Sequence, residues 1–294
     1  MFYRRKIILA LLQAFEGHLP KISLQKLLFL FTERQLKRDY DFIPYKYGCY
    51  SFSANADLVA MIGHGQLSED QASYTKIGSE NYIKLLSEND KKILIDIKIS
   101  YGHLTTNSLI KLTYLNYQYY SVNSIKAKEI LTDEQYQNVL KAKPVNDKTI
   151  LYTIGYEGIS LEEYLNRLVK NDVKVLVDVR NNPLSMKFGF SKKQLKNFCE
   201  SLGINYLHIP EVGIQSSQRQ ELKTQKDYDN LFEIYKKQNL QKTISQQEEI
   251  MQLLIEKKRI ALTCFEANIC QCHRKHLAEA IIKLPEWNFE LKHI

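Results

Sequence analysis

The sequence has no apolar run that approaches the roughly 18–20 residues needed to cross a membrane. Its basic first six residues and the apolar residues 7–12 resemble the start of a signal peptide, but no small-residue cleavage site follows them. It also contains no internal repeat and no low-complexity tract. We therefore expect a cytoplasmic protein without membrane contact, in which these first residues begin an amphipathic helix.

The cysteine content argues against a secreted disulfide framework. There are five cysteines, an odd number, and Cys264, Cys270 and Cys272 fall within nine residues. Such a cluster is more typical of a local site in a reducing compartment. The 44% of apolar and 25% of charged residues exclude collagen-like, coiled-coil and disordered proteins, and 294 residues suffice for about two domains.

Positive charge is concentrated near the N-terminus. The formal net charge is +8, and residues 1–50 carry nine basic and four acidic side chains, whereas residues 151–294 carry 21 and 18. A basic segment suits contact with a nucleic acid or another polyanion, although it also suits simple solubility. The residues expected to contact nucleic acid are Arg4, Arg5, Lys6, Lys26, Lys46 and Tyr47.

The polar segment 141–148, which contains Pro144, separates two regions of different pattern. We place a boundary near residue 146, with a mainly helical, winged-helix-like binding domain over 1–146 and an α/β domain carrying the active site over 147–294. In the first domain, apolar residues recur at helical spacing over 7–15 and over 24–31, where Ser23 is the expected N-cap. Residues 40–51 are aromatic and interrupted by Pro44 and Gly48, as a wing or loop would be, and helical patterns follow at 54–62, 88–100 and 108–117.

The segments Leu24-Gln25-Lys26-Leu27-Leu28-Phe29 and Pro44-Tyr45-Lys46-Tyr47-Gly48-Cys49-Tyr50-Ser51 resemble the Panacea (SocA-like) antitoxin superfamily over about residues 5–120. Cys49 departs from the proline that is usual after this glycine. The tyrosines here fit two interpretations, namely amphipathic residues at the core edge, or an aromatic and basic surface for a nucleic acid or a partner protein.

The second half alternates strand and helix patterns, which favours an open, doubly wound parallel sheet. Residues 173–179 are almost continuously apolar, as in a strand buried on both faces, and Ser160 with Glu163 forms a capping-box pattern. The expected strands are 149–154, 173–179, 204–209, 259–264 and an edge strand at 289–293, and the expected helices begin at 160, 191, 226 and 274.

Polar and reactive residues follow the strands of this predicted sheet, where ligands of such folds bind. The candidate catalytic residues are Glu157, Asp178, Glu266, Cys272 and His273, and the candidate ligand- or phosphate-binding residues are Gly155, Tyr156, Gly158, Arg180, Ser185 and Arg274. Each has a structural alternative. Asp178 would serve as a cap or as a base, Arg180 would hold that carboxylate or bind phosphate, and Gly155 and Gly158 would form a tight turn or an anion site.

The cysteine cluster also admits more than one interpretation. Cys264, Cys270, Cys272, His273 and His276 suggest a zinc site, but as metal ligands they are weak candidates, because their spacing matches no regular zinc motif. Alternatively, Cys272 is a reactive thiolate whose pKa is lowered by a helix N-terminus, His273 and Arg274. A third possibility is that small buried thiols border a site formed by Glu266, His273 and Arg274. The sequence requires no cofactor.

Separated motifs in this half resemble the uncharacterised "domain of unknown function 488" family over about residues 150–285. They are Tyr152-Thr153-Ile154-Gly155-Tyr156-Glu157-Gly158, Leu176-Val177-Asp178-Val179-Arg180 with Pro183 and Ser185, Gly189-Phe190-Ser191, and Cys264-Phe265-Glu266 before Cys272-His273-Arg274. The resemblance implies a Rossmann-like α/β domain and a shared site, but no settled reaction. The extra Cys270 and the N-terminal domain depart from the common form.

These features favour a hydrolase that acts on a nucleic acid or nucleotide, in the manner of a glycosylase or a nuclease. Asp178 and Glu266 would act as base or stabilise positive charge, His273 would donate a proton, and Arg180 and Arg274 would bind phosphate. By analogy, a role in defence or DNA maintenance is expected. The alternative is a non-enzymatic regulator that senses a nucleotide-like ligand and binds DNA or a toxin-like partner.

Overall fold

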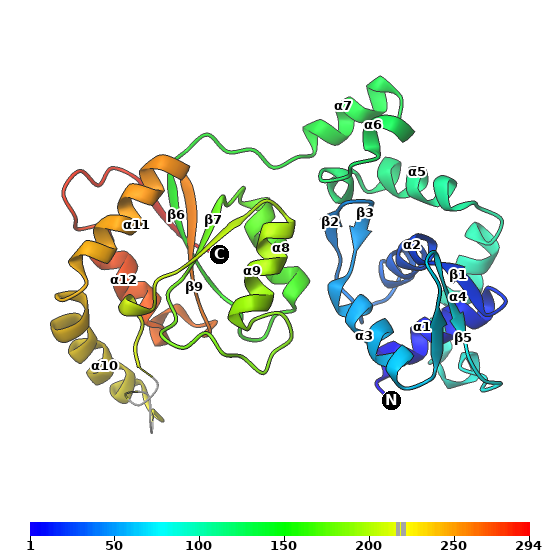
Figure 1. Cartoon of the computed structure of the whole chain (residues 1–294), viewed down its shortest axis with the longest axis horizontal. Coiled ribbons are helices and arrows are strands. Elements are labelled where there is room, and N and C mark those ends of the chain that lie inside the picture. The colour runs from blue at the N-terminus through cyan, green and yellow to red at the C-terminus, as the bar shows by residue number, and fades with distance from the viewer. Residues whose placement is uncertain (216–217, 219–221) are drawn as a thin grey trace. The chain divides into compact units, whose positions relative to one another are not determined.

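The computed structural model describes residues 1–215, 218 and 222–294, and it divides into two compact units, Met1–Lys143 and Pro144–Ile294 (Figure 1). The first unit is mainly helical, and the second is a mixed α/β domain. In the part of the chain so described, no helix combines the length and the apolar character that a membrane crossing requires.

The N-terminal unit has the element order of a winged helix. Its helices are α1 (Tyr3–Ala14), α2 (Lys21–Thr32), α3 (Phe52–Gly63), α4 (Glu88–Tyr101), α5 (Thr106–Asn116), α6 (Ala127–Ile130) and α7 (Asp133–Lys141). Its strands are β1 (His18–Pro20), β2 (Ile43–Tyr45), β3 (Gly48–Tyr50), β4 (Leu67–Glu69) and β5 (Ser73–Lys76). Strand β1, between α1 and α2, pairs antiparallel with β5, and β5 pairs with β4.

The aromatic segment 40–51, expected as a wing or loop, is separate from the sheet of β1, β5 and β4. That segment forms a separate two-stranded hairpin, β2–β3, between α2 and α3. Strand β1 pairs with β5 and not with β2 or β3, and in this register Leu19 lies opposite Tyr74.

Helix α2 also begins earlier than predicted. Pro20, the last residue of β1, stands at its N-cap position, so Ser23 lies inside the first turn. The Ser23 hydroxyl instead lies 2.8 Å from the Thr106 hydroxyl of α5. The sequence pattern missed this start because the strand passes directly into the helix without a polar capping residue.

Several basic residues expected to contact nucleic acid have partners within the unit. The Asp57 carboxylate of α3 is buried and accepts hydrogen bonds from Arg4 Nε at 2.6 Å, Arg5 Nε at 2.7 Å and the Tyr40 hydroxyl at 2.9 Å. Lys26 is 1% exposed, and its ammonium donates to the Cys49 carbonyl at 2.9 Å. Burial lowers the pKa of Lys26. Lys26 is therefore not available to a phosphate.

The C-terminal unit contains a five-stranded, all-parallel sheet in the order β10-β6-β9-β7-β8. The strands are β6 (Ile150–Gly155), β7 (Val175–Asp178), β8 (Asn205–His208), β9 (Arg259–Cys264) and β10 (Glu290–His293). The helices are α8 (Leu161–Lys170), α9 (Lys192–Ser201), α10 (Gln225–Ile234), α11 (Ile244–Lys257) and α12 (His273–Ile281). Every residue of β6, β7 and β9 is buried, as expected for central strands covered on both faces.

The sheet is doubly wound, as predicted. Figure 1 shows α8 and α9 on one face of the sheet and α10, α11 and α12 on the other. The chain passes from β6 through β7 to β8 at one edge, and then returns through β9 to β10 at the opposite edge. Because β9 lies between β6 and β7, the carboxyl ends of these three strands meet where the winding reverses, the usual place for a ligand site.

Replacement of Asp57 by asparagine should destabilise the N-terminal unit. The substitution removes the charge that Arg4 and Arg5 share, and we expect it to lower the free energy of unfolding by about 1–3 kcal/mol. Urea unfolding followed by circular dichroism measures the change. Glu69→Gln, which removes the exposed partner of Lys21, is the control and should cost less than about 1 kcal/mol. Equal effects of the two variants would contradict the assigned role of Asp57.

Candidate functional site

A cleft of about 340 Å³ lies at the carboxyl end of the parallel sheet. It is lined by Tyr156, Arg180, Asn181, Asn182, Leu184, Ser185, Met186, Ile214, Cys264, Phe265 and His273. The chain segments after β6, β7, β8 and β9 all contribute to this lining. Of the residues singled out in the sequence, Tyr156, Arg180, Ser185, Cys264 and His273 line this cleft. The sequence argument did not single out the asparagines, Leu184, Met186, Ile214 or Phe265, which follow the strand ends without being ionisable.

A buried ion pair forms one wall of the cleft. Asp178, the last residue of β7, is fully buried, and Arg180 is 6% exposed. Arg180 donates from Nε at 2.8 Å and from a terminal nitrogen at 2.5 Å to the two carboxylate oxygens of Asp178. The Tyr206 hydroxyl of β8 donates to the same carboxylate at 2.6 Å. Both oxygens of Asp178 are therefore engaged, so we assign it to positioning Arg180 rather than to proton transfer.

Arg180 is in turn fixed from two further directions. Its other terminal nitrogen donates to the Tyr156 hydroxyl at 2.7 Å and to the Phe190 carbonyl at 2.9 Å. The Tyr156 ring stacks on Phe190 with centroids 4.2 Å apart, and burial raises the pKa of the Tyr156 phenol. Ser185 forms a side-chain hydrogen bond with Tyr156. Much of the hydrogen-bonding capacity of Arg180 is thus used inside the protein, which limits its capacity to bind phosphate.

The loop after β6 is hydrogen-bonded to the loop after β9. The backbone N–H groups of Tyr156 and Glu157 donate to the Phe265 carbonyl at 3.1 and 2.9 Å, and the Glu157 carboxylate accepts from the Ala267 N–H at 2.9 Å. At Gly155 a Cβ atom would lie 2.0 Å from the Glu266 carbonyl oxygen, so only glycine permits this approach. Gly158 has a φ of +77°, which a tight turn requires.

Arg274 holds the same loop from the other side. It is 3% exposed and donates to the carbonyls of Glu266 at 2.5 Å and Ala267 at 3.4 Å. Its Nε atom is buried and has no hydrogen-bond partner among the described residues. Arg274, like Glu157, therefore shapes the loop that carries Glu266.

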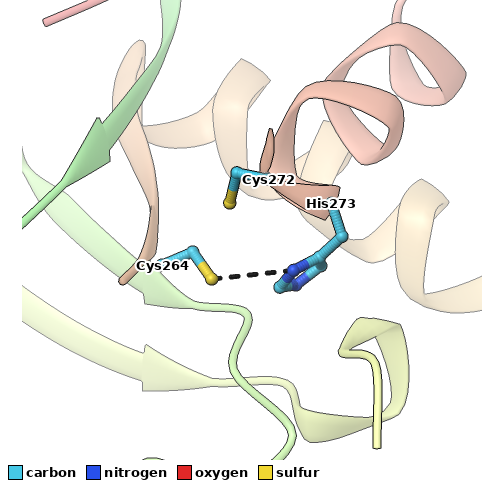
Figure 2. Close-up of side chains that lie close together, drawn as sticks. All are labelled: Cys264, Cys272 and His273. Atoms are coloured by element: carbon cyan, nitrogen blue, oxygen red, sulfur yellow. Dashed lines mark hydrogen bonds between the residues drawn. The ribbon is translucent and has the colours of Figure 1, made fainter. Parts of the chain in front are cut away.

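Two thiols and an imidazole converge at the base of this loop, as Figure 2 shows for Cys264, Cys272 and His273. All three residues are buried, and their Sγ, Sγ and ring nitrogen atoms lie within 4.8 Å of one another. Cys264 Sγ is 3.6 Å from His273 Nδ1 and donates to the Glu266 carboxylate at 3.1 Å. His273 donates from Nε2 to the Val179 carbonyl at 3.0 Å, which directs Nδ1 toward Cys264.

The other two candidate metal ligands, Cys270 and His276, do not belong to this group. Cys270 is exposed in a short turn at Ile269–Gln271. His276 lies 3.3 Å from the Glu279 carboxylate and packs against Phe232 of α10. Of the five residues that suggested zinc in the sequence, Cys264, Cys272 and His273 lie together, whereas Cys270 and His276 do not belong to this group.

The pKa of Cys272 differs from the sequence expectation. Burial raises the pKa of this thiol well above its usual value, and the neighbouring Cys264 raises it further. The expected thiolate at the start of α12 is therefore not favoured by its surroundings. The arrangement suits two kinds of chemistry, a cysteine–histidine pair at Cys264 and His273, or a metal ion held by all three side chains.

Asp178→Asn should strongly destabilise the C-terminal unit, because it leaves the buried Arg180 guanidinium without its counter-charge. We expect the free energy of unfolding to fall by about 3–5 kcal/mol. Fluorescence of Trp287, the single tryptophan of the chain, measures unfolding of this unit in urea. Glu163→Gln removes the exposed partner of Arg167 and should cost less than about 1 kcal/mol. A similarly small effect of Asp178→Asn would refute the role of the ion pair.

Gly155→Ala should displace the Glu266 loop, because the new methyl group overlaps a backbone oxygen that a side-chain rotation cannot move. We expect a loss of about 1–3 kcal/mol in thermal unfolding monitored by circular dichroism. Gly63→Ala is the control, since a Cβ atom there meets nothing within 4 Å. If both variants unfold at the temperature of the unmodified protein, the close approach at Gly155 does not constrain the loop.

Comparison with known protein families places a match on this unit alone. Residues 160–281 match the family described as Domain of unknown function DUF488. No curated protein matches the chain. The matched segment begins at the Ser160 N-cap of α8, ends with α12 and contains Asp178, Arg180, Cys264, Cys272 and His273. It includes none of the N-terminal unit, so the expected resemblance to the Panacea superfamily receives no support. The C-terminal unit thus carries a segment similar to the DUF488 family.

Proposed function

We propose that the C-terminal unit is a hydrolase that cleaves a bond in a nucleic acid or nucleotide bound in the cleft. One observation carries this proposal. The Glu266 carboxylate, the Cys264 thiol and the His273 imidazole are in contact with one another or share a partner, and two of them line a cleft at the reversal of a doubly wound sheet. Proton-transfer groups beside such a cleft are typical of an enzyme.

Glu266 is the best-placed general base. It is partly exposed, and its carboxylate accepts from Cys264 Sγ at 3.1 Å. Arg274 donates a hydrogen bond to the Glu266 carbonyl, and the loop after β6 is hydrogen-bonded to the neighbouring residues Phe265 and Ala267. These contacts fix the backbone that carries the Glu266 carboxylate. A positioned carboxylate contributes about 10²–10⁴-fold to a proton-transfer step. With Asp178 engaged by Arg180, Glu266 is the carboxylate that remains for this role.

The cleft walls support a planar substrate with polar edges. Phe265 is 44% exposed and Leu184 77% exposed, and with Met186 they offer apolar faces to a base. The Asn182 amide offers both donors and an acceptor. The volume of about 340 Å³ falls within the usual range of about 300–1,000 Å³ for small-molecule sites. A nucleobase with its sugar suits this combination.

For the N-terminal unit, nucleic-acid contact is best supported at the β2–β3 turn. Lys46 and Tyr47 are exposed there, and the Lys46 ammonium lies 5.7 Å from the centre of the Tyr45 ring. Helix α3, which follows α2 as a recognition helix would, contains neither lysine nor arginine. Binding through an exposed aromatic and basic turn therefore fits this unit better than insertion of α3 into a groove.

Substitution of Glu266 by glutamine tests the proposed hydrolase. The full-length protein is incubated with single- and double-stranded oligonucleotides and with a nucleotide mixture, and the products are identified by mass spectrometry. We expect Glu266→Gln to lower turnover at least about 100-fold, because the base is lost, and to change the dissociation constant less than about threefold. Cys270→Ser, in the same loop but exposed, should retain activity.

The products distinguish the alternatives. A released base indicates glycosidic cleavage, and a shortened strand indicates phosphodiester hydrolysis. Unchanged turnover in Glu266→Gln would refute the role of this carboxylate. Absence of turnover, combined with a nucleotide that alters the affinity for DNA, would replace the hydrolase by a ligand-sensing regulator.

A further inference from the structure

We propose that Cys264, Cys272 and the Nδ1 atom of His273 bind a zinc ion whose fourth coordination position opens into the cleft. The three ligand atoms come from the end of β9 and the start of α12 and lie within 4.8 Å of one another. Figure 2 shows the two sulfur atoms and the imidazole ring directed toward one another. Two sulfur ligands and one imidazole form a donor set that suits zinc.

The separation of one ligand pair already fits tetrahedral coordination. Zinc binds sulfur at about 2.3 Å and imidazole nitrogen at about 2.0–2.1 Å, which places these two ligands about 3.6 Å apart at the tetrahedral angle. Cys264 Sγ and His273 Nδ1 are 3.6 Å apart. This pair therefore needs no rearrangement to share an ion.

The surroundings of His273 provide a second, independent indication. A metal-ligating histidine usually donates its other ring N–H to a carbonyl or carboxylate, which fixes the ring and leaves one nitrogen for the metal. His273 donates from Nε2 to the Val179 carbonyl at 3.0 Å, and the ring is 1% exposed. The other ring nitrogen, Nδ1, lies 3.6 Å from Cys264 Sγ.

A catalytic cysteine–histidine pair explains less of this arrangement. It would use Cys264 and His273, but it gives no role to Cys272, whose fully buried sulfur belongs to the same group. A metal ion accounts for all three side chains. Three protein ligands, rather than four, are also the usual number in catalytic zinc sites, where water completes the coordination.

The open position connects the ion with the proposed hydrolase, and this part of the inference rests on that function. Cys264 and His273 line the cleft, and the Glu266 carboxylate lies next to Cys264. A zinc ion held by Cys264, Cys272 and His273 would supply Lewis acidity at this position. Glu266 would take a proton from a water molecule as the oxygen of that water forms a bond to the substrate atom under attack. The leaving group would depart with the electron pair of the broken bond and take the proton from Glu266.

Zinc binding is tested on the full-length chain after chelation and reconstitution. Zinc content is measured by elemental mass spectrometry, and affinity by competition with a chromophoric chelator. We expect one zinc per chain in the unmodified protein, and at least about tenfold weaker binding in Cys264→Ser, Cys272→Ser and His273→Ala. Cys270→Ser and His276→Gln are matched controls from the same segment and should bind like the unmodified protein.

A second measurement guards against variants that misfold. With Co²⁺ in place of zinc, thiolate ligation gives charge-transfer absorption, and each single cysteine variant should lose about half of it while circular dichroism stays unchanged. If the unmodified protein binds no more metal than Cys264→Ser, or if Cys270→Ser loses the metal, the proposed site is refuted.

Glu266→Gln separates the metal from the reaction. It should retain zinc while losing turnover, because Glu266 is assigned as a base and not as a ligand. Loss of zinc in this variant would make Glu266 the fourth ligand and overturn the open coordination position. If the protein binds zinc but turns over no nucleic-acid or nucleotide substrate, the proposed hydrolase activity is refuted and the zinc site is retained. If the metal-free protein has full activity, the role of zinc in the reaction is refuted and the hydrolase activity is retained.

Discussion

The ion pair between Asp178 and Arg180 is the interaction on which the carboxyl edge of the sheet depends. Its partners come from distant parts of the chain, with Tyr156 after β6, Phe190 before α9 and Tyr206 within β8. A buried pair of charges costs desolvation energy and contributes little net stability compared with apolar side chains of similar volume. Here it fixes the positions of neighbouring strand ends relative to one another, because every partner must be in place for the charges to be satisfied. The cleft owes its defined shape to this requirement.

The charged residues at this edge divide into two groups. The side chains of Glu157, Asp178 and Arg274 form hydrogen bonds within the protein and support the loops, whereas the Glu266 carboxylate accepts from the Cys264 thiol, which lines the cleft. A similar division occurs in the N-terminal unit, where Asp57 engages Arg4 and Arg5 while Lys46 stays exposed. In both units, many charged side chains therefore position the backbone or other side chains of the protein.

The sequence predicted the layered α/β domain well, because buried strands and amphipathic helices leave strong local patterns. It also located the cleft, since the carboxyl ends of parallel strands must meet at one edge. It did not predict which side chains would be engaged, because that depends on partners far away in the sequence. Asp178 is occupied partly by Tyr206, and Lys26 is buried under the carbonyl of Cys49. The start of α2 was missed because Pro20 gives no polar capping signal, and the pairing of β1 with β5 was not predicted because it is not local.

The turn that carries Cys270 explains why the spacing of the proposed zinc ligands is irregular in the linear sequence. Residues on either side of it are anchored, with Glu266 and Ala267 held by Arg274 and with Cys272 leading into α12. The turn between them is capped by Asn268 and lies at the surface. The positions of the Cys264 and Cys272 thiols therefore do not depend on the length of this turn, because β9 and α12 determine them. A search for this site in other chains is therefore better based on the strand end and the helix start than on a fixed number of intervening residues.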